Sequence, residues 1–256
     1  MNFAVFVYFL WSIITLNIFS IVTSQSDNLA DYFSHCKKNE SDFDNCVKDG
    51  LNGVRHLFKT GVPKYNIAPF DPFFASEVPQ KVGGRFFNYK LILKNVFESG
   101  WTISQVTRFR SDFNKNMIQY TQFFPDKKLK GEYDFVATIF GNTYANKGPW
   151  NLSLYDFVQT TTITRKPRIA SNATLVYDTP LKASVEVQSC KNMELHIGHL
   201  LQGRTVIENL ADRIINTAWQ PGFVVLKPII NDLVSTAFTE IFNKNFRYFP
   251  FHELFP

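Results

Sequence analysis

The sequence contains none of the short motifs that mark the common classes of enzyme. It has no Gly-x-Ser-x-Gly turn of an esterase, no phosphate-binding loop, no dinucleotide-binding fingerprint and no His-Glu-x-x-His zinc helix. An acid–base pair of side chains needs no such signature, so these absences do not exclude an enzyme, but they favour a binding protein. We therefore expect no catalytic activity, no cofactor and no metal site.

Two isolated groups are the nearest alternatives. His196 and His199 lie three residues apart, and on a strand such residues face opposite sides, so they could share one ion only if the strand ended between them. Cys190 with a histidine could form a nucleophile and a base, yet no local motif supports that pairing. Two ordinary histidines and a free thiol are the simpler interpretation.

Long apolar runs are scarce, and the chain has only one. Residues 3–22 are almost wholly apolar and uncharged, and the small residues Val22 and Ser24 precede a polar segment. This order predicts a secretory signal peptide at residues 1–24. The alternative is an uncleaved membrane anchor, since a run of about 20 residues can span a bilayer. The cleavage site favours the signal peptide, so we predict a secreted, extracellular protein with a single domain, residues 25–256, and no stable membrane insertion.

Cysteine is rare, with three residues in the chain. In an oxidising compartment Cys36 and Cys46 are the evident pair, which leaves Cys190 as a free thiol. Closing so short a loop would stabilise the fold by roughly 2.8 kcal/mol in the chain-entropy model. Three Asn-x-Ser/Thr sequons fit export and predict N-glycosylation, at Asn39, Asn151 and Asn172.

Clustered charge is also rare, although the net charge is +5. No run of basic residues is interleaved with aromatic ones, so we expect no nucleic-acid partner. The one tight basic cluster is Lys127-Lys128-Leu129-Lys130. We interpret it as a solvated turn in preference to an anion or membrane-surface patch.

What the sequence has in excess is phenylalanine, with 27 residues. An ordinary aromatic core would account for most of them. An apolar cavity for a ligand would need them too, because a cavity requires more inward apolar surface than a packed core does. Composition favours neither interpretation.

Two segments have the apolar spacing of helices. The first runs from Phe43 to Phe58, with Ser41 or Asp42 placed to cap its start and Gly61 placed to end it. The second segment begins with a capping box at residues 205–208, and its apolar spacing predicts one helix over about 205–219. A further helix follows over about 223–245, kinked or broken from the first by the Pro221-Gly222 step and Pro228.

Between these helices the apolar residues alternate as in strands. The clearest stretches are residues 128–139 and 181–187, with residues 87–93 and a weaker 117–124 beside them. Alternation with one polar face predicts an antiparallel sheet with one side in water. Strands grouped between helices favour an α+β fold.

Several short motifs follow one another in an informative order. The cysteine pair precedes a helix and then Gly61-Val62-Pro63 and Pro69-Phe70-Asp71-Pro72. Later stretches are Gly131-Glu132-Tyr133, residues 148–154 (GPWNLSL), Asn216 with Trp219, Lys227-Pro228, and the ending PFHELFP. In this order, over essentially the whole mature chain, the sequence resembles the insect takeout and haemolymph juvenile-hormone-binding protein family.

The resemblance implies a fold and a function. The fold is a long C-terminal helix wrapped by a strongly curved antiparallel sheet of the tubular lipid-binding type, enclosing an elongated apolar tunnel. The function is that of a monomeric extracellular carrier of a hydrophobic small molecule, such as juvenile hormone, a terpenoid or a fatty-acid-like lipid, in circadian, feeding or chemosensory physiology. The alternative is a lipid-transfer or membrane-active protein of the related tubular lipid-binding superfamily.

Two departures from the family pattern matter. Cys190 lacks the partner that gives the juvenile-hormone carriers their second disulfide, which places this chain nearer the takeout-like branch. Pro221-Gly222 falls where the family usually continues its long helix.

On such a fold, the inward apolar positions predict the lining of the tunnel. Tyr89 and Tyr133 are in phase with the apolar strand faces, so their hydroxyls either donate to a ligand or bond to the backbone in an ordinary core. The predicted lining residues are Phe87, Tyr89, Leu91, Leu93, Tyr133, Phe135, Ile139, Val185 and Trp219.

The segment Gly61–Pro72, GVPKYNIAPFDP, carries three prolines yet is apolar. It cannot join the interior of a sheet, so we predict that it lies extended against one. In that position Val62, Ile67 and Phe70 would cover one edge of the hydrophobic interior.

Overall fold

The computed structural model describes residues 28–84, 87–169, 175–200, 205–249 and 251–255, so the predicted signal peptide and Asn172 lie outside the described residues. The helices are α2 (Ala30–Phe33), α3 (Phe43–Gly53), α4 (Thr205–Thr217), α5 (Trp219–Phe246) and α6 (Phe251–Leu254), with short 3-10 turns η1 (Val54–Phe58), η2 (Pro63–Tyr65) and η3 (Phe113–Lys115). The strands are β1 (Phe73–Val82), β2 (Phe87–Ser99), β3 (Gln105–Asp112), β4 (Met117–Ile139), β5 (Asn142–Arg165), β6 (Arg168–Ile169), β7 (Leu175–Val176), β8 (Leu181–Ser189) and β9 (Asn192–Ile197).

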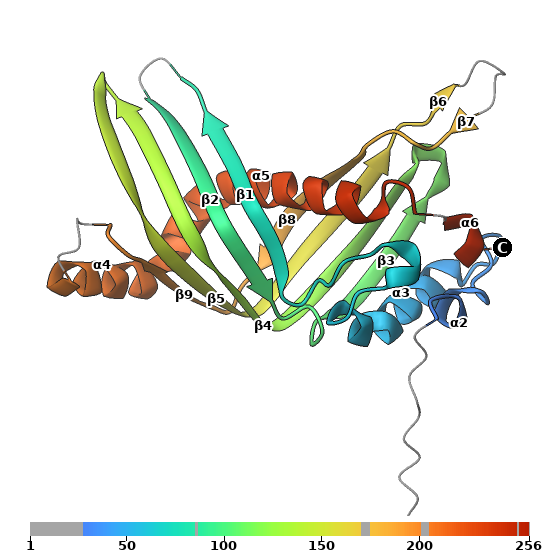
Figure 1. Ribbon diagram of the computed structural model, residues 1–256. Helices are drawn as coiled ribbons and strands as arrows, with labels where there is room; N and C mark the ends of the chain where they lie inside the picture. Colours follow the sequence, from blue (N-terminus) through green and yellow to red (C-terminus); the bar gives the residue numbers. More distant parts are fainter. Residues whose placement is uncertain (1–27, 85–86, 170–174, 201–204, 250, 256) are drawn as a thin grey trace, which may run out of the picture.

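The predicted α+β architecture is confirmed. Two halves of one strongly curled antiparallel sheet spread apart as a V, and the long helix α5 runs across the V from one half to the other (Figure 1). Helix α4 lies at the left end of this view, while α2, α3 and α6 gather at the right end (Figure 1). Within the described residues, no helix combines the length and apolarity needed to cross a bilayer.

The two halves arise because the long central strands β4 and β5 change neighbours along their length. β4 pairs with β3 over residues 117–123 and with β2 over residues 128–139. β5 pairs with β9 over residues 150–155 and with β8 over residues 158–165. At about 3.3 Å per residue each central strand spans roughly 75 Å, so both run through the two halves of the molecule.

The bend between the halves coincides with an interruption of the β4–β5 ladder. The pairing passes from Phe124↔Phe157 to Asp126↔Tyr155 and skips Pro125 and Asp156. Pro125 has no N–H to donate to the ladder, and Asp156 has a positive φ of 46°. We call this place, where the central strands change partners, the waist.

The helix boundary differs from the prediction by a few residues. The break falls at Ala218, whose φ of −112° and ψ of 22° are not helical, and α5 begins at Trp219. Pro221 is therefore the third residue of α5, where a backbone N–H has no intrahelical acceptor, so the proline removes no hydrogen bond. The helix also continues through Pro228.

Helix α5 is attached to the edge strand β8 by a ladder of side-chain hydrogen bonds. The backbone N–H groups of Val187, Val185, Ala183 and Leu181 donate to the side-chain oxygens of Asn231, Ser235, Thr239 and Asn243, at 3.0, 2.8, 3.0 and 2.7 Å respectively. Four residues of helix rise about 6.0 Å, and two residues of strand about 6.6 Å, so the two spacings match. Asn216 of α4 extends the pattern by bonding both the N–H and the carbonyl of Leu195 in β9.

The prediction of a solvated turn at Lys127–Lys130 is wrong. β4 runs straight through these residues, and its alternation exposes Lys128 and Lys130 while it buries Lys127, which is 3% exposed. The Nζ atom of Lys127 pairs with the Glu98 carboxylate at 2.6 Å. Four aromatic rings surround it at 4.2–5.9 Å, those of Trp101, Phe124, Phe157 and Phe238. This opposite charge and these rings explain how a lysine is buried at the waist.

The ladder predicts that Thr239→Val destabilises the protein, because the N–H of Ala183 then loses its acceptor. We expect the free energy of unfolding in urea to fall by about 1–3 kcal/mol. Thr236→Val is the matched control on the same helix, since the Thr236 hydroxyl is exposed and donates only to the Asp232 carbonyl. We expect that control to stay within about 0.5 kcal/mol of wild type. Equal effects of the two variants would contradict the role of the ladder.

The buried ion pair makes a second prediction. Lys127→Met leaves the Glu98 carboxylate buried without its cation, so we expect a loss of about 3–5 kcal/mol in urea unfolding. Replacing both partners, as Lys127→Met with Glu98→Leu, removes the uncompensated charge and is expected to recover most of that loss. A double variant as unstable as the sum of its parts would show that the two side chains do not act as a pair.

Candidate functional site

The candidate site is an apolar cavity of about 990 Å³. Its walls come from β3, the first part of β4, the last part of β5, β8, the second half of α5 and the terminal helices α2, α3 and α6. It therefore belongs to one half of the molecule. Its volume is at the upper end of the roughly 300–1,000 Å³ typical of small-molecule sites.

The wall is rich in phenylalanine. It contains 13 of the 27 phenylalanines of the sequence, namely Phe33, Phe43, Phe58, Phe70, Phe73, Phe109, Phe113, Phe238, Phe242, Phe246, Phe249, Phe251 and Phe255. Of the two interpretations of the phenylalanine excess, the cavity accounts for about half of these residues. Phe238, Phe242 and Phe246 follow one another at four-residue steps along α5, with ring centroids 6.1 and 5.5 Å apart. Aromatic rings in contact are stiff, because each has few torsions to reorganise.

The two described ends of the chain close this half of the molecule together. The predicted disulfide between Cys36 and Cys46 is formed and ties the α2 segment to α3. The ring of Phe255, near the C-terminus, lies 5.7 Å from that of Phe33 and 5.6 Å from that of Phe43. Both ends therefore contribute to the cavity wall.

The proline-rich segment Gly61–Pro72 also contributes to the wall, but in a different conformation from the predicted one. It is not extended, because Val62 and Ile67 exchange backbone hydrogen bonds of 2.9 and 3.2 Å across the turn η2. The buried amide of Asn245 in α5 holds this closed loop by accepting from the N–H of Ala68 at 3.1 Å. Val62, Ile67 and Phe70 line the cavity, so the expectation that they cover the hydrophobic interior is confirmed.

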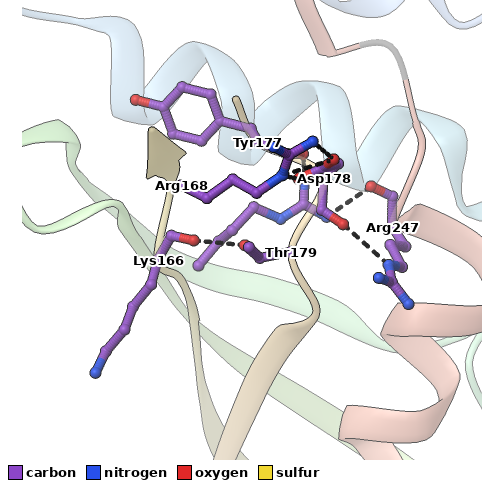
Figure 2. Close-up of polar contacts among 7 residues, drawn as sticks. Lys166, Arg168, Tyr177, Asp178, Thr179 and Arg247 are labelled. Atoms are coloured by element: carbon purple, nitrogen blue, oxygen red, sulfur yellow. Dashed lines mark hydrogen bonds and ion pairs between the residues drawn. The ribbon is translucent and has the colours of Figure 1, made fainter. Parts of the chain in front are cut away.

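One end of the cavity wall carries a cluster of arginines around the C-terminus of α5 (Figure 2). Arg165 donates from Nη1 to the carbonyl of Tyr177 at 2.7 Å and from Nη2 to that of Arg247 at 2.8 Å. Arg247 donates from Nε to the carbonyl of Asp178 at 3.0 Å. Arg168 holds the Asp178 carboxylate from outside, through Nη2 at 2.6 Å (Figure 2). Burial lowers the pKa of Arg165, and the like charge of Arg247 lowers it further.

The end of the cavity nearest the waist offers neutral polar groups. Gln122 is 3% exposed and donates from Nε2 to the hydroxyl of Ser104 at 2.6 Å. Burial raises the pKa of Tyr120, so its hydroxyl stays protonated. The indole N–H of Trp101 is buried and has no hydrogen-bond partner among the described residues. This end of the wall is therefore polar without carrying a full charge.

The predicted tunnel residues lie elsewhere. No residue of that set with a described side chain contributes to the wall of this cavity. Leu91, Leu93, Tyr133 and Phe135 belong to an apolar cluster with Val78, Val96 and Trp150 in the other half of the sheet. Tyr89 packs on Phe135, with ring centroids 5.9 Å apart. Phe87 begins β2 in the same half. A tunnel lined by this cluster stays a prediction.

The remaining predicted residues are spread along the molecule. Val185 is buried against Phe238 beside the waist, and Trp219 packs edge-on against Phe223 at the start of α5. Ile139 is 38% exposed at the tip of β4. The hydroxyls of Tyr89 and Tyr133 are already engaged, with Gln80 Oε1 at 3.1 Å and the Gly198 carbonyl at 3.0 Å.

Sequence reasoning missed the arginines and the aromatic row of α5. The four-residue spacing of Phe238, Phe242 and Phe246 was a readable signal, because it places three rings on one helical face. Arg165 and Arg247 gave no such signal. Their proximity depends on where β5 and α5 end in space.

His196 and Cys190 have protein partners in the structure. β9 does end at Ile197, between His196 and His199, but Nδ1 of His196 contacts the Asp212 carboxylate. Cys190 is half-buried, its thiol donates to the Asn192 carbonyl at 3.0 Å, and burial raises its pKa, which disfavours the nucleophilic thiolate. Within the described residues, the three metal-type ligands that lie close together are His35, Cys36 and Cys46, and both cysteines are in the disulfide.

This chain is similar to known proteins in sequence and in fold. The circadian clock-controlled protein daywake of Drosophila melanogaster is 18% identical over 251 residues, which cover 95% of each chain. The crystal structure of Takeout 1 from Epiphyas postvittana superposes with a TM-score of 0.58 at 14% identity, over 82% of this chain and 95% of that one, and supports the same fold.

A family model gives the family directly. The model of the haemolymph juvenile hormone binding protein (JHBP) family matches residues 13–256, nearly the whole chain. This match agrees with the resemblance of the ordered motifs and with the curved sheet around a long helix. The chain therefore belongs to the haemolymph juvenile hormone binding protein family, whose members bind hydrophobic small molecules.

Proposed function

We propose that the protein is a secreted carrier that binds a hydrophobic small molecule, without catalysis, in the cavity of about 990 Å³. The observation that carries this proposal is the wall itself, with 13 phenylalanines around an unfilled volume. A packed core would fill such a volume with side chains. The ligand classes that fit an aromatic wall include juvenile hormone, terpenoids and fatty-acid-like lipids.

The energetics of an apolar ligand fit this wall without many polar contacts. A ligand of about 20 heavy atoms, at roughly −0.3 to −0.4 kcal/mol per atom, gains about −6 to −8 kcal/mol. That range corresponds to a Kd from tens of micromolar to about one micromolar. Tighter binding requires one or two well-placed polar contacts, which either end of the cavity could supply.

The proposal also covers the setting of the carrier. We propose export through the signal peptide at residues 1–24, a monomeric state, and sugars on Asn39, Asn151 and Asn172. The side chains of Asn39 and Asn151 are exposed, as glycosylation requires. A role in circadian, feeding or chemosensory physiology is part of the same proposal, since daywake is described as clock-controlled.

A specific surface favours a second candidate function, action at a lipid membrane. Helix α4 and the first turns of α5 expose apolar side chains, including Val206 at 82%, Val224 at 71% and Val225 at 75%. Helix α4 and the start of α5 lie at the end of the molecule opposite α2, α3 and α6 (Figure 1). Exposed apolar residues on surface helices are the means by which proteins lie in a lipid interface.

The carrier proposal predicts uptake of a neutral fluorescent probe, the methyl ester of a polyunsaturated fatty acid, and the presence of a nonpolar molecule in organic extracts of the purified protein. Ile118 lines the cavity, and Ile118→Gln places an amide in the apolar wall. We expect it to weaken uptake by about ten-fold, because burying an unpaired amide costs about 1–3 kcal/mol.

Ile139→Gln is the matched control, since Ile139 lies in the same strand but outside this cavity. Thermal unfolding of both variants separates loss of binding from loss of the fold. If Ile139→Gln blocks uptake and Ile118→Gln does not, the ligand lies in the other half, along the predicted tunnel. Failure of the folded wild-type protein to take up any nonpolar probe would overturn the carrier proposal.

The membrane alternative predicts that the protein sediments with phosphatidylcholine vesicles. The double variant Val224→Ser, Val225→Ser removes apolar surface from an exposed stretch of α5, so we expect it to lose most vesicle binding while its probe uptake stays unchanged. Ser76→Ala with Thr107→Ala is a surface control at exposed positions of β1 and β3, outside α4 and α5. Absence of the wild-type protein from the vesicle pellet would exclude this alternative.

A further inference from the structure

The cavity wall is apolar in its body but unbalanced in charge. Among its described lining residues five are charged, the basic Lys38, Arg55, Arg165 and Arg247 and the acidic Asp178. The wall therefore carries an excess of three positive charges at neutral pH. A concave surface with an excess of one sign of charge attracts a ligand of the opposite sign.

Two of these cations, Arg165 and Arg247, meet at the C-terminal end of α5. Their charges do not cancel, because the backbone carbonyls that accept from both side chains are neutral dipoles. The one carboxylate beside them, that of Asp178, is taken by Arg168, which bonds it through Nε at 2.8 Å and Nη2 at 2.6 Å (Figure 2). The Asp178 carboxylate also attracts Arg165 and Arg247, but three guanidinium groups share this one anion, so the cluster keeps an excess of positive charge.

Arg247 also has donors to spare. It uses its Nε–H on the Asp178 carbonyl, and its two Nη atoms donate to none of the described residues. The Nε–H of Arg165 is buried within the wall, so Arg165 contributes its charge to the site and not a free donor. A charge-assisted bond in a partly dehydrated site gains more than it would in water.

A cavity with an aromatic wall and two cations at one end fits one class of molecule, a long-chain amphiphile with an acidic head group. Resting on the proposed carrier function, we propose that the ligand is a long-chain carboxylic acid in its ionised form. Its hydrocarbon chain lies among Phe238, Phe242 and Phe246, and its carboxylate contacts Arg165 and Arg247. A planar carboxylate matches the donor geometry of a guanidinium, and charge-assisted bonds of this kind are the stronger ones.

The proposal separates this ligand class from neutral molecules of the same length. An ester or an alcohol fills the apolar body equally well but leaves the arginine pair without an anion. A hydrogen bond to a charged group is stronger than one between neutral groups, so we expect the acid to bind about ten-fold more tightly than its methyl ester.

The test compares a fluorescent polyunsaturated fatty acid with its methyl ester at neutral pH, on the full folded chain. Arg247→Gln removes one cation, and we expect roughly five- to ten-fold weaker binding of the acid with unchanged binding of the ester. Arg247→Lys keeps the charge and should retain most of the preference for the acid. Arg165 is not chosen for replacement, since its bonds to the carbonyls of Tyr177 and Arg247 hold the wall together.

Lys166→Gln is the matched control for charge. Lys166 is exposed, and its side chain points away from the arginine cluster (Figure 2). We expect this variant to bind both probes as the wild-type protein does. Equal affinities for acid and ester, unchanged in Arg247→Gln, would overturn the carboxylate proposal and leave the carrier standing. Equal weakening of both probes in Arg247→Gln would also overturn it, as a structural effect, and failure to bind either probe would overturn the carrier as well.

Discussion

The hydrogen bonds between α5 and the edge of β8 determine how this molecule is put together. An edge strand presents unpaired N–H and carbonyl groups that would otherwise invite another chain to pair. Here four polar side chains, Asn231, Ser235, Thr239 and Asn243, occupy the place of a neighbouring strand. These four bonds fix the position of α5 along β8 and its rotation about its own axis. The neighbouring side chains of Phe238, Phe242 and Phe246 must therefore face into the sheet. The position of the cavity wall is thus a consequence of how the edge strand is satisfied.

The waist separates two halves with different interiors. On one side of it lies the cavity, and on the other side the cluster of Leu91, Leu93, Tyr133 and Phe135 is packed against β1 and α5. Between them the ion pair of Lys127 and Glu98 sits in a box of aromatic rings. A buried charge pair resists being moved apart, because each charge would be left without compensation in an apolar surrounding. The waist therefore holds α5 against both central strands at the point where the sheet bends.

The sequence allowed the fold class and several elements to be predicted, because alternation and helical spacing report which residues are buried locally. β8 alternates as expected over residues 181–187, and α3 begins at Phe43. The prediction for the basic cluster was wrong because three charges in four residues suggested exposure to solvent. Alternation in a strand instead places Lys127 and Lys128 on opposite faces. The cavity could not be located, since inward positions of β4 look alike along its whole length. Which half of a curved sheet encloses space depends on the strands and termini that close it.

The last turns of α5 join stability and binding in one short segment. Asn243 closes the ladder on β8, Asn245 holds the proline-rich loop, and the carbonyl of Arg247 accepts from Arg165. Unpaired carbonyls at the end of a helix need donors, and a guanidinium supplies them while it also compensates the negative end of the helix dipole. Because Arg165 donates to the carbonyl of Arg247 at this helix end, its guanidinium lies at the cavity wall beside that of Arg247. Satisfying the helix end thus creates the charged end of an otherwise apolar site, so a ligand with one acidic group would complete a charge arrangement that the fold itself leaves open.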